Sequence, residues 1–368
     1  PSLLITVCIM VSFLLFCYPF ESLYLCSKTI QEMDRKLIIR NFGAIKSASI
    51  CLKDYNIFIG EQGSGKSTIA KLITIFEGYT INRIGDFQQN LLSLFEEHNI
   101  ASYFNEDTYI HFSWEGGTIY YEYNRFACEV PESKEISPIA NLYIPAERFF
   151  VSTFSRSLAT LVLNKAPIPN TLLNFASIYE KAKKKYPNYN ISIFDMLFQT
   201  DKSNETLYLK ESHKTIPFKD ASSGIQSVIP LLMVLDYAVD EKEYNRFVIE
   251  EPELNLFPQT QVQLLQQIVR KCSKVTLTTH SPYLLSAFNN LIEAHNALIS
   301  TPSKAEEIYK LVPKECILNF ENVGAYKIEN GKVASILDEE YRLIIADQID
   351  SVADQESQIF SELLNLEA

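Results

Sequence analysis

The chain has 368 residues, with 33 Lys and Arg against 45 Asp and Glu, and its formal net charge is −12. Hydrophobic residues make up 47% and charged residues 21%, a balance typical of a folded globular protein, and the 11 Gly and 15 Pro are too few for a collagen or a low-complexity linker. The acidic balance argues against a protein that coats nucleic acid, because phosphate binding needs a basic surface. The length allows two domains, or one large core with an insertion.

The seven cysteines show neither a CxxC pattern nor paired metal-ligand spacing. This usage predicts free thiols in a reducing compartment, and therefore a cytoplasmic protein.

Residues 3–20 form an uncharged apolar run that differs from the rest of the chain. Three interpretations stay open. The run is long enough for a membrane anchor but has no Lys/Arg cluster on either flank, and as a signal peptide it lacks a positive n-region. The chain begins with Pro, and Met33 opens the first strand-like pattern, so we favour the third interpretation, that residues 1–32 are translated upstream sequence.

A phosphate-binding loop is predicted at residues 60–67. Residues 37–39 and 48–52 are expected to pair as strands around a turn at Gly43, and residues 56–59 form a short buried strand. The following GEQGSGKS fits G-x-x-x-x-G-K-[ST], and an apolar-periodic helix comes next. The predicted nucleotide-binding residues are Gly60, Glu61, Gln62, Gly63, Ser64, Gly65, Lys66, Ser67 and Thr68.

The chemistry of such a loop needs these residue types. Backbone N–H groups close around the β-phosphate, and the helix N-terminus adds partial positive charge. Lys66 is expected to reach the β- and γ-phosphates of ATP, and Ser67 to ligate Mg²⁺.

Two further strands are expected to bring polar residues to the same edge. Residues 247–249 run into Glu250-Glu251-Pro252-Glu253, and residues 274–279 run into His280. Carboxyl ends of parallel strands face the crevice where such sheets bind ligands. We expect Glu250 to hold Mg²⁺, Glu251 to polarise the attacking water, and His280 to sense the γ-phosphate.

The order of the motifs GEQGSGKS, SSGIQ, FVIEEPE and TTHSP resembles that of ATP-binding-cassette (ABC) ATPases. It is most similar to the soluble branch with RecF, SMC and OLD-type proteins, including bacterial defence and AbiEii-like toxin–antitoxin ATPases. The resemblance covers about residues 36–288 and includes the opening hairpin IIRNFGAIKSASICL, the stretch EEPELNLFPQTQ, which resembles EEPExHLHPxxQ, and the segments YIPAER and TTHSPYLLSAFNNLI.

This resemblance implies an α/β P-loop NTPase fold of the ABC-head type. Residues 33–368 would form one ATPase domain with a parallel core sheet, an antiparallel β-subdomain and a helical subdomain at about residues 150–220. The cofactors would be ATP and Mg²⁺. Two copies would sandwich ATP as a homodimer, with Ser223, Gly224 and Gln226 of the signature SSGIQ contacting ATP across the dimer.

The chain departs from the family pattern at three places. Ile225 replaces a signature glycine, Glu250 stands where Asp is usual, and no Q-loop glutamine is evident. Glu147 and Arg148 stand near the Q-loop place, where they either couple the nucleotide to the helical subdomain or form a structural ion pair.

The rest of the sequence is expected to complete this plan. Residues 108–114 and 118–123 predict a hairpin, residues 152–163, 171–185 and 192–197 predict helices, and residues 347–366 predict an amphipathic helix. A lysine run at 181–185 is either a solvated helix face or a nucleic-acid patch, and we favour the former.

Two classes of function remain, with a third that the charge does not support. The first is an ATPase switch that controls a separate effector protein, such as a nuclease or toxin, because no two-metal pattern follows His280. The second is the ATP-binding subunit of a membrane transporter, although we consider a membrane partner less plausible. The third is a RecF- or SMC-like DNA-repair ATPase.

We expect a chain that lacks residues 1–32 to be a soluble, folded ATPase, because the strand-forming pattern starts after Met33. Gel filtration and nucleotide turnover of the truncated and full-length chains check this. Aggregation of the truncated chain, with the full chain purifying from membranes, would favour the anchor instead.

Overall fold

The structure is a computed structural model that describes residues 35–78, 87–115, 117–129, 141–154, 158–201, 204–345 and 358–359. The predicted segments at 1–32 and 347–366 lie outside these ranges, apart from residues 358–359. Within the described ranges, no helix has the length and apolar character to cross a bilayer.

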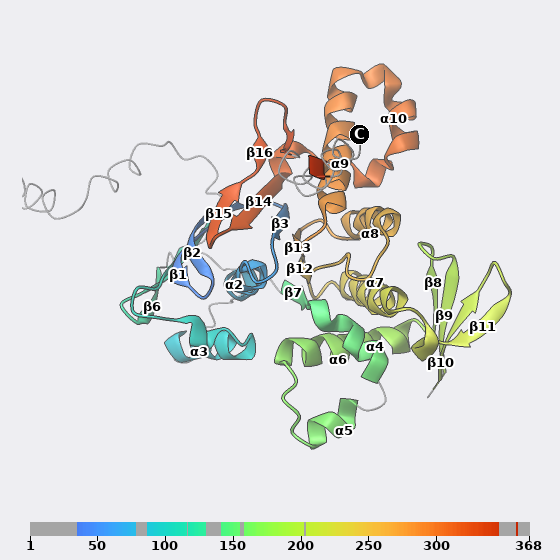
Figure 1. The fold of residues 1–368 in the computed structure, drawn as a ribbon, viewed down its shortest axis with the longest axis horizontal. Helices are drawn as coiled ribbons and strands as arrows, with labels where there is room; N and C mark the ends of the chain where they lie inside the picture. The colour runs from blue at the N-terminus through green and yellow to red at the C-terminus, as the bar shows by residue number, and fades with distance from the viewer. Residues whose placement is uncertain are drawn as a thin grey trace, which may run out of the picture.

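One mixed sheet of eleven strands runs through the molecule (Figure 1). Five of its strands form a parallel core, in the spatial order β14 (Val323–Glu329), β3 (Tyr55–Gly60), β13 (Val275–Thr279), β12 (Arg246–Glu250) and β7 (Asn141–Ile144). The other six strands follow beyond β14 in the order β15 (Lys332–Ser335), β2 (Ile45–Leu52), β1 (Arg35–Phe42), β4 (Tyr109–Trp114), β5 (Gly117–Glu122) and β6 (Arg125–Glu129). The hairpins predicted at Gly43 and at residues 108–123 are thereby confirmed.

Alternation along the parallel strands gives the sheet one hydrophobic core on each face. Ile57 packs with one cluster and the adjacent Phe58 with the other. Along β12, Phe247 and Ile249 belong to the first cluster, and Val248 belongs to the second. Side chains of a strand point alternately to its two faces, so a continuous apolar run in these strands means burial on both sides.

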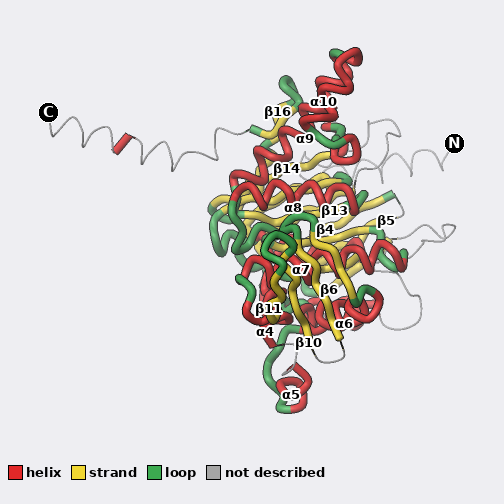
Figure 2. Tube along the Cα trace, turned by 90° about the vertical axis from the view of Figure 1, so that its right-hand side faces the viewer, coloured by secondary structure: helices red, strands yellow, loops and turns green. Residues whose placement is uncertain are grey.

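Helices cover the two faces. The second cluster contains α2 (Lys66–Gly78) and α3 (Phe87–Glu97). The first contains α6 (Asn170–Lys185), α7 (Ser223–Glu241), α8 (Pro258–Lys271) and α9 (Pro282–Ser300). The shorter helices are α4 (Phe149–Phe154), α5 (Leu158–Leu163) and α10 (Ala305–Leu311), and the strands β16 (Leu337–Asp338) and β17 (Leu343–Ile344) form a small separate pair. α10 and α5 lie at opposite ends of the molecule in both views (Figure 2).

The prediction of a helix at residues 192–197 is wrong. The chain forms a second, antiparallel sheet there, from β8 (Asn188–Ile191), β9 (Met196–Asp201), β10 (Asn204–Leu209) and β11 (Lys214–Pro217). Phe198 and Leu207 are cross-strand partners and both are fully buried. Their burial follows a period of two across the hairpins, which a short apolar run such as 191–198 does not distinguish from a helix face.

The predicted helix at 171–185 is confirmed as α6, and two of the four lysines at 181–185 form ion pairs. Lys183 contacts Glu180 and Glu205, each at 2.6 Å, and Lys185 contacts Glu241 at 2.7 Å. These ion pairs favour a solvated structural face over a nucleic-acid patch.

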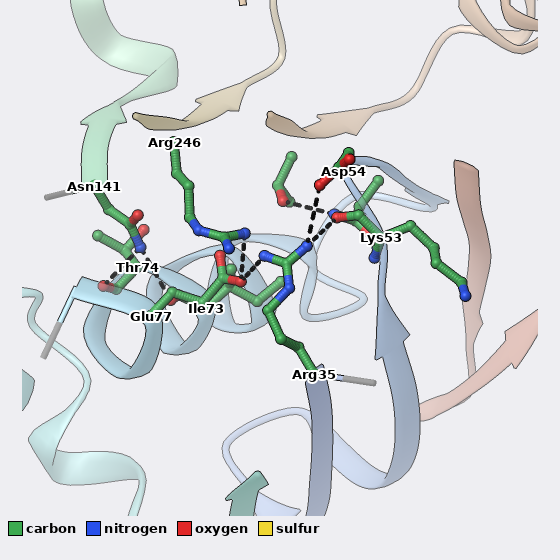
Figure 3. Close-up of polar contacts among 10 residues, drawn as sticks. Arg35, Lys53, Asp54, Ile73, Thr74, Glu77, Asn141 and Arg246 are labelled. Atoms are coloured by element: carbon green, nitrogen blue, oxygen red, sulfur yellow. Dashed lines mark hydrogen bonds and ion pairs between the residues drawn. The ribbon is translucent and has the colours of Figure 1, made fainter. Parts of the chain in front are cut away.

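A buried ion cluster fixes the far end of α2 against the sheet (Figure 3). The carboxylate of Glu77 lies between Arg35 of β1 and Arg246 of β12, with a 3.0 Å contact to Arg246. The Asn141 side-chain amide also donates to the carbonyl groups of Ile73 and Thr74, at 3.5 and 3.3 Å, near the helix C-terminus. The position of α2 is therefore set at the end opposite its phosphate loop.

We expect Glu77→Ala to lower the free energy of unfolding by about 3–5 kcal/mol, because it removes the 3.0 Å carboxylate partner of the buried Arg246, while Arg35 keeps a contact with Asp54 at 3.6 Å. Glu321→Gln is the matched control, since Glu321 is exposed and pairs with Arg342 at 2.7 Å on the surface, and it should cost less than about 1 kcal/mol. Chemical denaturation measures both. Equal costs for the two variants would contradict a structural role for the cluster.

Candidate functional site

The phosphate loop joins the end of β3 to the start of α2 and depends on glycine at three points. Gly63 and Gly65 have φ values of +75° and +109°, which L side chains rarely adopt. At Gly60, a Cβ atom would lie 2.5 Å from the Ile328 carbonyl oxygen. The loop therefore adopts a turn that a side chain at these three positions would strain or block.

Lys66 folds back over this loop. Its Nζ donates to the carbonyl oxygens of Gly60 and Glu61, at 2.8 and 2.9 Å, and lies 3.4 Å from Nδ1 of His280. Burial lowers the pKa of the Lys66 ammonium group, while the nearby carboxylates, Glu251 first among them, act to raise it. The cation is thus held at the mouth of the loop by weak acceptors that a phosphate can replace.

Ser67 and Glu250 come together beside the loop, as predicted for a magnesium site. Ser67 is exposed at the start of α2, Thr68 is buried behind it, and Glu250 is only 4% exposed. Burial raises the pKa of the Glu250 carboxyl group, and interactions with the Ser67 and Tyr143 hydroxyl groups oppose this shift. Glu250 Oε1 is buried without a hydrogen-bond partner.

An unpartnered carboxylate oxygen next to a serine hydroxyl fits Mg²⁺, which prefers oxygen ligands and is usually bound by one or two protein groups plus phosphates and water. No cluster of three or more His, Cys, Asp or Glu side chains suited to a metal occurs in the described residues. Ser67 and Glu250 would hold the ion, with phosphate oxygens and water as its other ligands.

Glu251 and His280 form a direct pair at the carboxyl ends of β12 and β13. The distance from His280 Nε2 to Glu251 Oε1 is 2.9 Å, and both side chains stay partly exposed. Glu251 has φ +41°, a left-handed conformation that costs a non-glycine residue on the order of 1–3 kcal/mol. Its N–H donates to the Thr278 carbonyl at 3.0 Å.

Arg148 binds the backbone of the turn at residues 250–252, which contains the strained Glu251. It is fully buried and donates to the carbonyl oxygens of Glu250 at 2.7 Å, Glu251 at 2.8 Å and Pro252 at 3.2 Å, as well as to Pro145 at 3.2 Å. Burial lowers its pKa to about 10. The guanidinium group thus binds backbone carbonyl groups rather than forming the simple ion pair that was one of its two alternatives, and a coupling role stays a prediction.

Glu253 is a site residue that the sequence analysis did not single out. Its carboxylate accepts hydrogen bonds from Thr279 Oγ1 at 2.6 Å and from the His280 N–H at 2.8 Å, and it is 8% exposed. Glu253 therefore connects the acidic turn after β12 to His280, the predicted γ-phosphate sensor after β13. The position of Glu253 in the quoted EEPE stretch was the one available signal.

The signature residues lie at the N-terminus of α7. Ser222 caps the helix and is exposed together with Ser223. A Cβ atom on Gly224 would lie 2.6 Å from the Asn255 carbonyl oxygen, so this glycine allows α7 to approach the loop after the acidic turn. Gln226 is buried, and its amide donates to the carbonyl groups of Lys219 and Ala221, each at 2.9 Å. Of the three predicted trans contacts, the structure brings Ser223 to the surface but uses the Gln226 amide within the chain.

A cavity of about 580 Å³ adjoins the outer side of the phosphate loop. Loop residues from Gly60 to Ser64 line one wall, together with His280, and the β14–β15 hairpin lines the other. The apolar side chains Ile59, Leu285 and Ile336 also line it.

The order and geometry of these motifs agree with a comparison against protein families. The family model AAA_15, described as an AAA ATPase domain, matches residues 33–113 and 152–285, which is more than half of the chain. The chain belongs to the AAA ATPase domain family. Its α/β fold, with a large mixed sheet and a P-loop, is the expected one. No curated protein matches the sequence.

Several solved structures are similar to this AAA ATPase domain protein. The SMC head domain from Thermotoga maritima is 12% identical, with a TM-score of 0.42 over 83% of this chain and 100% of that chain. The recombination mediator protein RecF is 10% identical, with a TM-score of 0.41 and coverages of 84% and 100%. An ATP-binding cassette of an ABC transporter in its ADP conformation is 12% identical, with a TM-score of 0.37 and coverages of 87% and 98%.

We expect Lys66→Ala to reduce ATP turnover at least 100-fold, because the variant removes the positive charge that the loop holds at its mouth. Lys310→Ala on the exposed surface of α10 is the control and should keep full activity. A phosphate-release assay with both variants tests this. Undiminished turnover in Lys66→Ala would place the reaction elsewhere.

Proposed function

We propose that this AAA ATPase domain protein hydrolyses ATP at the phosphate loop, with Glu251 as the general base. The observation that carries the proposal is the contact chain from Lys66 to His280 to Glu251, at 3.4 and 2.9 Å. These three residues come from three separate parts of the sequence and meet at one edge of the sheet. A cation, an imidazole and a carboxylate in contact there can bind a phosphoryl group and a water molecule side by side.

In this proposal, each protein group has one task. The loop N–H groups and Lys66 bind the β- and γ-phosphates, and Lys66 exchanges the carbonyl groups of Gly60 and Glu61 for phosphate oxygens. Ser67 and Glu250 hold Mg²⁺, which when bound neutralises charge on the phosphate oxygens. Glu251 accepts the proton of the attacking water, and His280 is placed to contact the γ-phosphate, with its Nε2 facing Glu251 and its Nδ1 facing Lys66.

The proposal extends to an ATP-dependent homodimer. Glu251 and His280 are about one-quarter and one-third exposed in the single chain, so water has free access to the site. A second copy would exclude it, and the exposed Ser223 at the N-terminus of α7 offers a hydroxyl and N–H groups suited to a phosphate. A twofold arrangement uses the same surface on both copies.

For the biological role, we propose that the dimer controls a separate effector chain, as in the defence and toxin–antitoxin ATPases that the motifs resemble. The support is the order of the motifs. A cytoplasmic location stays a prediction. The transporter and DNA-repair alternatives gain no specific contact from the structure.

We expect Glu251→Gln to bind ATP with unchanged affinity but to lose at least 100-fold in turnover, because the amide keeps the shape and cannot accept the proton. The trapped state should be a dimer that light scattering detects only with ATP. Glu250→Gln is the matched variant one residue away, and it should weaken Mg²⁺-dependent nucleotide binding.

Titration calorimetry, turnover and mass with and without ATP separate the two carboxylates. Normal hydrolysis by Glu251→Gln would refute the assigned base, and a monomer with bound ATP would refute the dimer. Exchange of the two phenotypes would move the base to Glu250.

A further inference from the structure

The turn that carries Glu251 is connected to the signature helix by a continuous set of hydrogen bonds. The first step is Arg148, whose guanidinium group binds the carbonyl groups of Glu250, Glu251 and Pro252. Arg148 directly precedes α4. Because its side chain is fully buried and rigidly bound, the start of α4 and the acidic turn have to move together.

The second step runs from α4 to α7. Ser152 Oγ donates to the backbone carbonyl of Gln226 at 2.7 Å, and Thr153 Oγ1 lies 3.3 Å from Gln226 Oε1. Ser152 is buried, so its hydroxyl has no bulk water as an alternative partner.

The third set of hydrogen bonds connects Gln226 to the segment that precedes the signature serines. The Gln226 amide donates to the carbonyl groups of Phe218 at 3.4 Å, and of Lys219 and Ala221 at 2.9 Å. These carbonyls belong to the segment that joins β11 to Ser222. A displacement of the exposed signature serines therefore reaches Gln226, α4 and Arg148 in turn.

We propose that Arg148 is a positioning residue that sets Glu251 according to the position of the signature helix. The inference rests on the proposed function and adds a connection, within one chain, between the signature segment at the start of α7 and the proposed base Glu251. Glu251 has φ +41°, and an unsupported non-glycine residue leaves that region readily. Arg148 binds the carbonyl groups of Glu250 and Glu251, which lie on either side of the φ and ψ bonds of Glu251. The guanidinium group therefore maintains the backbone conformation in which the Glu251 carboxylate contacts His280.

Two sets of variants test the link. Arg148→Lys keeps the charge but replaces a planar fork of five donors by a single ammonium group. Ser152→Ala with Thr153→Val breaks the α4–Gln226 contacts without touching the acidic turn. Thr301→Val is the matched control. The Thr301 hydroxyl donates to the Ala297 carbonyl of α9 at 2.9 Å, and the Thr153 hydroxyl likewise donates to the Phe149 carbonyl of its own helix at 3.2 Å.

We expect Arg148→Lys to lower kcat about 10- to 100-fold with less than a twofold change in ATP affinity, since a small misplacement of a catalytic group has effects of this size. The Ser152→Ala/Thr153→Val pair should lower kcat several-fold in the wild type and scarcely at all in Arg148→Lys, because both act through one path. The same fold-loss in both backgrounds, or no loss in the wild type, would overturn the link. If Arg148→Lys does not fold, the loss in the hydroxyl pair alone decides.

A second measurement does not depend on turnover. The N–H of Glu251 donates to the Thr278 carbonyl, and we expect its hydrogen exchange to be at least several-fold faster in the Ser152→Ala/Thr153→Val protein than in Thr301→Val. Unchanged exchange would refute the link even if ATP hydrolysis is normal. If the wild-type chain does not hydrolyse ATP, the proposed function fails, and the exchange result still decides whether the two elements are connected.

Discussion

The guanidinium group of Arg148 is the interaction on which the geometry of the site depends. In the part of the chain that the structure describes, its hydrogen bonds go to main-chain carbonyl oxygens rather than to a carboxylate. Hydrogen bonds that involve a charged group contribute about 1.5–3 kcal/mol each, more than neutral ones. Four such contacts satisfy a buried guanidinium group, whose charge is favoured by the nearby carboxylates of Glu253 and Glu251, and at the same time fix a turn that would otherwise relax. The carboxylates above this turn are then free for chemistry, because none of them is needed to neutralise Arg148 by direct contact.

A second charged cluster acts at the C-terminal end of α2. Glu77, Arg35 and Arg246 hold the C-terminal end of α2, while the phosphate loop forms its N-terminal end. The helix is therefore fixed at one end and presents its partial positive charge at the other. The two hydrophobic cores on either face of the sheet complete this arrangement, because they keep the strand ends that carry Glu250 and His280 in register.

The sequence predicted those parts of the site whose chemistry is local. The glycines and Lys66 of the loop lie within eight consecutive residues, and the β-branched and apolar strand patterns FVI and VTLTT are followed directly by Glu250 and His280. Arg148 and Glu253 could not be assigned in this way, since their partners lie 102 and 27 residues away and the contacts form only after the strands pair. The strands β8–β11 were missed for a different reason: the apolar residues near Phe198 are too few to separate a period of two from a helical one.

The place of the β14–β15 hairpin in the sheet has a consequence for the order of folding. β14 lies directly beside β3, and the Gly331 carbonyl at the hairpin turn accepts the N–H groups of Lys46 and Ser47. The strand that leads into the phosphate loop thus completes its pairing with residues made nearly 270 positions later. Contacts of such long sequence separation form slowly, and an unpaired strand edge is open to other chains until they do. During synthesis, β3 therefore waits for the last part of the domain, so the nucleotide-binding loop is among the earliest segments to be made and among the last to be completed.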